Sequence, residues 1–131
     1  MLIYAREMTA EVSEIARRIE GTGRKRVMGF RDDEMCFVGY DDILRFEAMN
    51  QKVFAQTKEG ALRIKQRLYE LEEALVGTPF VRISNSEIVN FDKVASLDLS
   101  MTGILILKFK NGDKSYVSRR YVKKIKDYLG L

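Results

Sequence analysis

A succession of short apolar runs separated by polar residues is the feature that most constrains how this chain can fold. The runs are only a few residues long and are rich in Val, Ile, Phe and Tyr, which is typical of strands. Polar pairs such as Asp41-Asp42 and Asn50-Gln51 separate neighbouring runs, as they do in antiparallel hairpins. The pattern predicts a mainly β (α+β) fold with strands over residues 35–40, 43–49, 53–57, 61–64, 80–84, 94–101, 104–109 and 115–117.

The pair Asn111-Gly112 is the strongest single turn signal in the sequence. Asn-Gly favours a type I′ turn because both central residues of that turn need a positive φ. We therefore predict a hairpin that joins the strands at 104–109 and 115–117 through a type I′ turn.

Two helices interrupt the strands. Residues 65–76 carry Leu68, Leu71, Leu75 and Val76 on one face and stop before Gly77, as helices often do. The last helix begins after Ser118 and ends at Gly130. The apolar stripes of both helices are predicted to pack on the core.

The first residues are predicted to form a separate strand and helix. Residues 2–5 are an apolar strand, and a helix capped by Thr9 follows with one apolar face, made by Val12, Ile15, Ala16 and Ile19. Glycines and a basic triplet over residues 21–26 then break the helical pattern and indicate a linker or tight turn. Because 131 residues suffice for one ordinary domain, we expect an N-terminal strand–helix extension (1–28) and a single domain (29–131).

The chain contains no histidine and a single cysteine, Cys36. Serine and cysteine triads that use histidine, zinc sites built from imidazole and internal disulfides are therefore excluded. We expect no catalytic site, no metal site and no cofactor. No run reaches the roughly 18 apolar residues of a membrane span, and the N-terminus lacks the apolar region of a signal peptide, so a cytoplasmic protein is expected.

Positive charge is concentrated at the C-terminal end of the chain. Residues 108–131 contain eight Lys or Arg and two Asp, a net charge of 8 − 2 = +6, whereas the other residues carry 15 − 17 = −2. A basic end of this kind is the electrostatic footprint expected for binding a polyanion such as nucleic acid. A solvated helix face would show the same pattern.

Three polar loop segments, residues 49–52, 84–86 and 118–120, carry side chains suited to reading DNA. Asn and Gln pair bidentately with adenine and Arg pairs with guanine, whereas Lys and Ser suit phosphates. Each segment taken alone is also an ordinary turn.

Two longer motifs contain the second and third of these segments. The pattern F-x-R-x-x-x-S-x-x-V-N covers residues 80–90, and V-S-R-R-Y covers residues 117–121. With the strand at 43–49 and the leucines of the predicted helix at 65–76, they resemble the LytTR DNA-binding domain of bacterial transcription regulators over roughly residues 35–129. The resemblance implies an elongated β-β-β fold of small antiparallel sheets with short helices, whose loops enter successive major grooves.

The resemblance also implies roles for individual residues. Base contacts would come from Gln51, Asn85 and Arg120. Contacts to the DNA backbone would come from Lys52, Ser86, Lys114, Ser115, Ser118 and Arg119. Two further motif residues are predicted to be structural: Asn90 closes a turn before residues 91–92, and Arg82 pairs across the sheet.

The expected function is that of a stand-alone, sequence-specific transcriptional regulator without a receiver domain. Its expected partners are double-stranded DNA, a second copy of the chain on repeated half-sites and, by resemblance to stand-alone members, a membrane-embedded regulatory partner. The N-terminal extension is a candidate dimer contact. The competing hypothesis is a protein-interaction or signalling adaptor whose basic C-terminal helix meets an acidic partner or a membrane surface; binding to duplex DNA in the presence of nonspecific competitor distinguishes the two.

Overall fold

The computed structural model describes residues 26–99 and 104–131, which form two antiparallel sheets and two α-helices. The first sheet contains β1 (Arg26–Arg31), β2 (Glu34–Gly39), β3 (Ile43–Met49), β4 (Lys52–Thr57), β5 (Gly60–Ile64), β6 (Phe80–Ser84) and β7 (Glu87–Asn90). The second contains β8 (Val94–Leu99), β9 (Leu105–Phe109) and β10 (Lys114–Val117). The helices are α2 (Leu68–Ala74) and α3 (Arg119–Leu129), and two short 3-10 turns are η2 (Tyr40–Asp42) and η3 (Phe91–Lys93).

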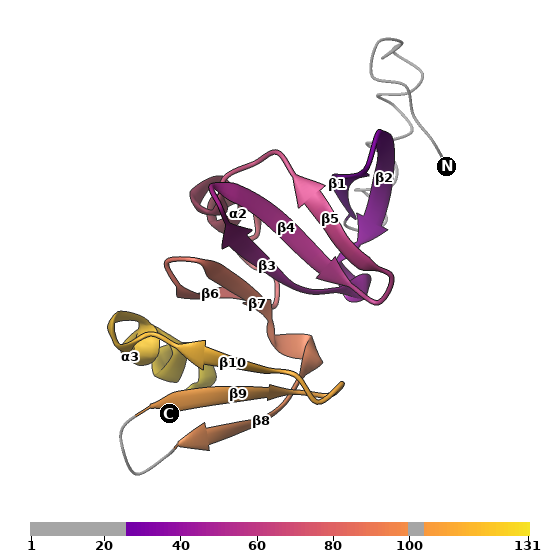
Figure 1. Ribbon diagram of the computed structural model, residues 1–131. Coiled ribbons are helices and arrows are strands. Elements are labelled where there is room, and N and C mark those ends of the chain that lie inside the picture. The colour runs from indigo at the N-terminus through magenta and orange to yellow at the C-terminus, as the bar shows by residue number, and fades with distance from the viewer. Residues whose placement is uncertain (1–25, 100–103) are drawn as a thin grey trace.

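The strands of the first sheet lie in the order β2-β1-β5-β4-β3-β7-β6, and those of the second in the order β10-β9-β8. Figure 1 shows the second sheet below the first, and the hairpin of β6 and β7 forms the edge of the first sheet that faces the second. The prediction of a mainly β fold made of small antiparallel sheets and short helices is confirmed.

The β6–β7 hairpin lies between two hydrophobic cores. Ile88 packs into the first core with residues of β3, β4, β5 and α2. Ile83 and Val89 pack into the second core with β9, β10 and Ile125 of α3. Because neighbouring residues of a strand point to opposite faces, the two faces of this hairpin pack on different cores. Strand β7 is not among the predicted strands, because it has only four residues and the polar Glu87 and Asn90 stand at its two ends.

Strand β1 is a second element that is absent from the predicted strands. It begins at Arg26, which was assigned to the basic linker, and it contains Gly29 at its centre. A Cβ atom at Gly29 would lie 3.0 Å from Cβ of Leu62, so glycine permits the close approach of β1 and β5. The predicted strand at 2–5 and the predicted helix after it lie outside the described residues, and residues 26–28 of the expected extension form the first half of β1.

The two helices differ in how well the sequence predicted them. The prediction of a helix over 65–76 is wrong at both ends, because α2 spans only Leu68–Ala74. Ile64 still pairs with Val53 in the sheet, and the carboxylate of Glu70 accepts a hydrogen bond from the Arg67 backbone N–H, which fixes the start of α2. The last helix is confirmed, and it ends at Gly130 in the left-handed conformation.

The hairpin of β9 and β10 is confirmed, but its predicted type I′ turn is wrong. Asn111 does not have a positive φ, and its side-chain oxygen instead accepts a hydrogen bond from the Asp113 backbone N–H at 2.9 Å. Four residues, 110–113, connect the strands, so only Gly112 needs a positive φ. The turn with two positive φ values joins β3 to β4, at Asn50 (52°) and Gln51 (64°).

Asn90 connects the end of β7 to the start of β3. Its side chain is buried and donates hydrogen bonds to the carbonyl oxygens of Tyr40 (3.2 Å) and Ile43 (3.0 Å). Its own side-chain oxygen accepts a hydrogen bond from the backbone N–H of Asp92 at 3.0 Å. The prediction that Asn90 is structural and closes this turn is confirmed.

Replacing Asn90 is expected to destabilise the fold. Asn90→Ala removes a 3-10 cap and leaves buried carbonyl oxygens without a donor, so the free energy of unfolding should fall by about 2 to 4 kcal/mol in urea denaturation. Asn90→Asp, nearly the same size, should destabilise at least as much at pH 7, because a carboxylate oxygen would face two carbonyl oxygens. A loss below about 0.5 kcal/mol for both variants, the range of ordinary surface substitutions, would contradict this role.

Candidate nucleic-acid interface

Two backbone hydrogen bonds bring the three polar loop segments to one side of the molecule. The N–H of Ala48 donates to the Ser86 carbonyl at 2.8 Å, which joins the end of β3 to the β6–β7 turn. The N–H of Ser118 donates to the Ile83 carbonyl at 2.9 Å, which joins the β10–α3 junction to the same hairpin. Figure 1 shows the β3–β4 turn, the β6–β7 turn and the start of α3 at the left of the molecule.

The first loop is the two-residue turn between β3 and β4. Met49 and Lys52 face each other in the register, so Asn50 and Gln51 alone form the tip of the hairpin. Both have positive φ values, and Gln51 occupies a position at which a type I′ turn favours glycine. The side chains of Gln51 and Lys52 are exposed. A glutamine in this conformation costs conformational energy and presents a long amide side chain to solvent.

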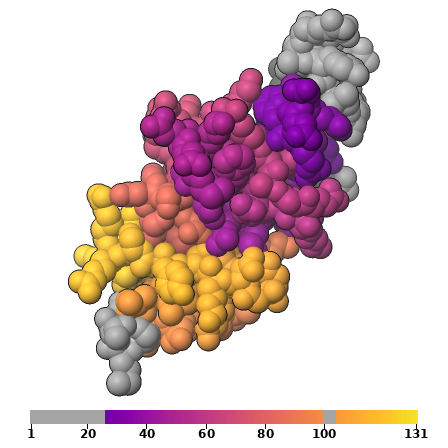
Figure 2. All heavy atoms as spheres, viewed as in Figure 1, coloured from indigo at the N-terminus to yellow at the C-terminus, as the bar shows by residue number. Residues whose placement is uncertain are grey.

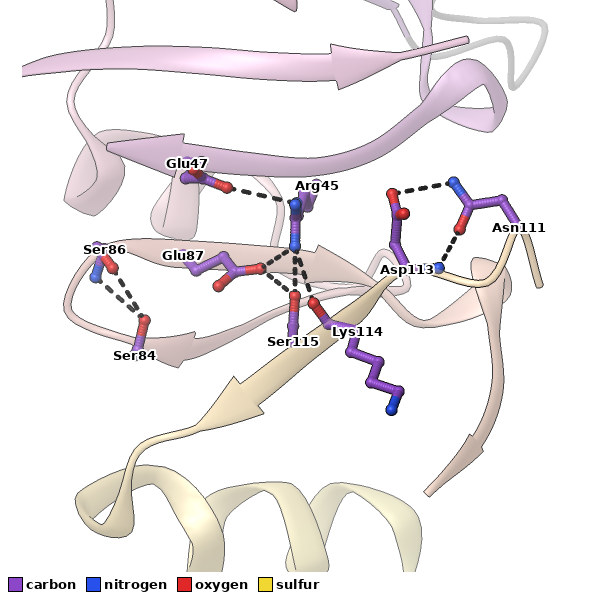
Figure 3. Close-up of polar contacts among 9 residues, drawn as sticks. All are labelled: Arg45, Glu47, Ser84, Ser86, Glu87, Asn111, Asp113, Lys114 and Ser115. Carbon is purple, nitrogen blue, oxygen red and sulfur yellow. Dashed lines mark hydrogen bonds and ion pairs between the residues drawn. The ribbon is translucent and has the colours of Figure 1, made fainter. Parts of the chain in front are cut away.

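The second loop is the β6–β7 turn, which Arg82 holds in place. Nε of Arg82 donates to the Ser84 carbonyl at 3.0 Å, and a terminal nitrogen donates to the Asn85 carbonyl at 2.8 Å. The Ser86 N–H donates to the Ser84 hydroxyl oxygen at 3.2 Å (Figure 3). The side chains of Asn85 and Ser86 remain exposed at the tip. Arg82 therefore fixes the backbone on which Asn85 stands.

The third loop is the junction between β10 and α3. Arg119 and Arg120 are exposed at the first turn of α3, and no acidic side chain in the described part of the chain pairs with either. The hydroxyl of Tyr121 donates to the side-chain oxygen of Asn85 at 3.4 Å, so the second and third loops are in contact. Figure 2 shows the residues of α3 against those of β6 and β7. Two guanidinium groups that lack a carboxylate partner in the described residues therefore lie in the helical turn that contacts Asn85 through Tyr121, which makes this surface positively charged.

Glu72 of α2 links the elements that carry the second and third loops. Its carboxylate accepts a hydrogen bond from Arg82 at 3.2 Å and another from Nζ of Lys124 in α3 at 2.9 Å. The prediction that Arg82 pairs across the sheet is therefore wrong, because its acidic partner belongs to a helix. Burial would raise the pKa of Glu72, but the hydrogen bonds from Lys124 and Arg82 outweigh it, and the pKa is lowered.

A second polar network joins the two sheets behind the loops (Figure 3). Arg45 of β3 donates to the carboxylate of Glu87 at 3.1 Å, to the Ser115 hydroxyl at 2.6 Å and to the Lys114 carbonyl at 3.4 Å. The Ser115 hydroxyl itself donates to Glu87. Glu47 forms a further ion pair with Nε of Arg45 at 3.4 Å. Burial raises the pKa of Glu87, and the Ser115 hydrogen bond and the Arg45 charge offset this only in part.

Most of the predicted DNA-contacting side chains are exposed, namely Gln51, Asn85, Arg120, Lys52, Ser86, Lys114 and Arg119. Ser115 is different, because only 2% of its surface is exposed and its hydroxyl belongs to the network with Glu87. That burial does not fit the expected contact of the Ser115 side chain with the DNA backbone. Ser118 is half-buried, and its hydroxyl oxygen is buried without a hydrogen-bond partner in the described structure.

The positioning residues Glu72, Arg82, Arg45 and Glu87 are absent from the predicted site. Arg82 lies within a recognised motif, but its hydrogen bonds to the turn depend on side-chain direction, which the spacing alone does not give. The partners of Arg45 lie 42 and 70 residues away in the sequence, so no local pattern could identify them.

Two other kinds of site are absent from the described residues. No group of three or more His, Cys, Asp or Glu side chains there could hold a metal ion. None of the helices within residues 26–99 and 104–131 is long and apolar enough to cross a membrane.

Comparison with known proteins gives this geometry a family. The model of the LytTr DNA-binding domain matches residues 33–130. An uncharacterized HTH-type transcriptional regulator of Staphylococcus aureus strain NCTC 8325 is 34% identical over 98% of this chain and 88% of its own length, and one from strain MRSA252 is 33% identical over the same shares. The solved structure of a LytTr DNA-binding domain from Bacillus cereus is similar with a TM-score of 0.77 and 25% identity, over 83% of this chain and 100% of that one.

The HTH in the names of the relatives refers to a helix–turn–helix. In the described residues of this chain, the strands from β6 to β10 separate α2 from α3, so these two helices do not form that motif. The exposed polar side chains lie instead on loops at the ends of strands.

The two carboxylates predict opposite dependences of stability on pH. The pKa of Glu72 is lowered, so its stabilising contribution is present above pH 4.5, its ordinary value, and is lost as the pH falls. The pKa of Glu87 is raised, so the folded state binds its proton more tightly and loses stability as the pH rises above 4.5. The free energy of unfolding of Glu72→Gln, relative to that of the wild type, should therefore increase as the pH falls. The free energy of unfolding of Glu87→Gln, relative to that of the wild type, should increase as the pH rises towards neutrality.

Urea denaturation of the three proteins from pH 3 to pH 7 tests this pair. The measured quantity is the difference in the free energy of unfolding between each variant and the wild type. Each variant serves as the control for the other, because the two differences should change in opposite directions with pH. If both differences changed in the same direction, the opposite pKa shifts of Glu72 and Glu87 would be contradicted.

Proposed function

The chain belongs to the LytTR family of DNA-binding domains, and we propose that it reads base edges in duplex DNA with Gln51, Asn85 and Arg120. It is a DNA-binding transcriptional regulator, not an enzyme. The single observation that carries the proposed mode of reading is the convergence of three separate loops on one side of the molecule, through the hydrogen bonds of Ala48 and Ser118.

The side chains at the three loops suit different chemical partners. The amides of Gln51 and Asn85 each combine a donor and an acceptor, which matches the N6 and N7 edge of adenine. The guanidinium of Arg120 matches O6 and N7 of guanine. Lys52, Ser86, Lys114 and Arg119 are exposed and are proposed to bind phosphates, which supply affinity and register rather than sequence.

The buried serines are assigned differently within this proposal. Ser115 supports the interface from behind through Glu87, and we do not count its side chain among the phosphate contacts. The Ser118 hydroxyl stands at the N-terminus of α3, where it lacks a protein partner. A phosphate near the start of α3 would be favoured by the helix dipole, and the buried Ser118 hydroxyl would have to turn outward to donate to it.

The arrangement of partners is a further part of the proposal. We propose that two copies bind side by side on repeated half-sites and, by resemblance to stand-alone family members, that a membrane-embedded protein regulates the chain. Analytical ultracentrifugation on duplexes with one and two half-sites tests the first proposal. A mass of one protein per duplex at every half-site number would exclude it.

Arginine and lysine variants should separate base reading from phosphate binding. Arg120→Ala should cost about 1 to 3 kcal/mol on the preferred duplex and relax the preference at one base pair. Lys114→Ala should weaken binding to all duplexes equally and reduce the slope of log K against log salt by about 1. Selection from a random duplex pool, followed by fluorescence anisotropy over a salt series, measures both.

An unchanged sequence preference for Arg120→Ala would exclude base reading by this residue. Equal binding to preferred and random duplexes by the wild type would favour the competing function, in which the basic α3 helix meets an acidic partner or a membrane surface.

The β3–β4 turn predicts a trade-off between stability and binding. Gln51→Gly relieves a side chain at a φ of 64°, so the free energy of unfolding should rise by about 1 kcal/mol. The same change removes the proposed base-reading amide, so affinity for the preferred duplex should fall by about tenfold or more. Gln51→Ala is the matched control, because it should lose the affinity without gaining the stability.

A further inference from the structure

The β1–β2 hairpin carries apolar side chains on both of its faces. On the face towards the first core, buried Val27 lies opposite Val38. The opposite face carries four large apolar side chains in two cross-strand pairs, Met28 with Phe37 and Phe30 with Met35. We call these four residues the outer patch. None of them belongs to either buried core, and 43% of the surface of Met28 is exposed.

The outer patch has a basic border. Phe30 lies opposite Arg63 of β5, and Nζ of Lys65 lies 4.8 Å from the centre of the Phe30 ring. Ala61, Arg63 and Lys65 are exposed, whereas Leu62 and Ile64 face the core. On the other side, β2 is the edge of its sheet in the described structure, with β1 as its only partner. A clustered apolar face of this kind calls for a covering element.

We propose that the outer patch is covered by the N-terminal segment of the same chain, through the helix predicted over residues 9–19. The apolar stripe of that helix is made by Val12, Ile15, Ala16 and Ile19. An amphipathic helix with one apolar stripe needs an apolar surface to bury it, and the outer patch is such a surface.

The length of the connecting chain supports coverage by the same molecule. The residues 20–25 between the predicted helix and β1 include Gly21 and Gly23. Six residues span up to about 20 Å when extended, which is enough to reverse direction and return over the hairpin. A helix of eleven residues is about 16 Å long, close to the roughly 20 Å of a six-residue strand, so the stripe and the hairpin match in length.

Charge complementarity also supports this occupant. At 100° per residue, Glu20 borders the apolar stripe on one side. Glu11 borders it on the other side with Arg18 about 20° beyond, and Arg17 lies on the opposite face. Arg63 and Lys65 line the border of the outer patch. The carboxylate at the Glu20 edge of the stripe therefore complements the basic margin of the sheet.

Methyl NMR on the full chain tests the proposal directly. With isoleucine and methionine methyl groups labelled, we expect nuclear Overhauser effects from Ile15 or Ile19 to Met28 or Met35 within one molecule. A sample mixed from two differently labelled preparations distinguishes contacts within a chain from contacts between chains. Contacts seen only between chains would overturn the proposal in favour of a second copy, and the absence of contacts would overturn it altogether.

A charged substitution provides a second measurement. Met28→Asp should speed amide hydrogen exchange of residues 9–19 by about tenfold, because burial of a methionine contributes more than the 1.4 kcal/mol that corresponds to that factor. Val76→Asp, at a residue 80% exposed beyond the end of α2, is the matched control and should leave that exchange unchanged. Equal exchange rates in wild type and Met28→Asp would also overturn the proposal. Affinity for DNA should change less than twofold in both variants, so this result is independent of the proposed base reading.

Discussion

The guanidinium of Arg45 ties together the two sheets of this protein. Its partners Glu87 and Ser115 come from β7 and β10, and β10 leads directly into α3. The cation and the carboxylate are both largely buried, so each depends on the other and on the hydroxyl between them for its hydrogen bonds. Strands β3, β7 and β10 are joined through these three side chains. The β3–β4 turn, the β6–β7 turn and the start of α3 therefore keep their relative positions.

The proposed loop-based interface places unusual demands on local backbone geometry. The backbone of a recognition helix is held by the hydrogen bonds of the helix itself. The backbone of each loop here needs hydrogen bonds from residues outside the loop. Arg82 provides that support for the β6–β7 turn, and Glu72 joins it to α3. At the β3–β4 turn, a glutamine holds a conformation that glycine would adopt at lower cost. The strain at Gln51 is consistent with a side chain kept for binding rather than for folding.

Local patterns in the sequence predicted most of the fold. Strands with one buried face alternate, so β4 and β5 were found almost to the residue, and α3 was found from its apolar stripe and Gly130. Strands β1 and β7 were not found, because Gly29 interrupts the apolar run of β1 and because β7 has only two apolar residues, between Glu87 and Asn90. The exposed residues of the candidate site were predicted from their positions in the motifs. The burial of Ser115 could not be predicted in this way, because it depends on Arg45, which lies 70 residues away in the sequence. The predicted type I′ turn at Asn111 was wrong because four residues, rather than two, connect β9 to β10.

The order of the elements along the chain bears on when this interface can exist. Its three loops come from residues 49–52, 84–86 and 118–120, and the last of them is held by a hydrogen bond from Ser118 to Ile83. A domain with contacts this distant in sequence folds late, after loop closure has been achieved. During synthesis the nascent protein therefore lacks the third of the proposed base-reading loops until α3 has left the ribosome. On the proposed mode of reading, products of premature termination that lack α3 would be missing Arg119, Arg120 and the hydrogen bond from Ser118 to Ile83, so they would bind DNA more weakly than the full chain.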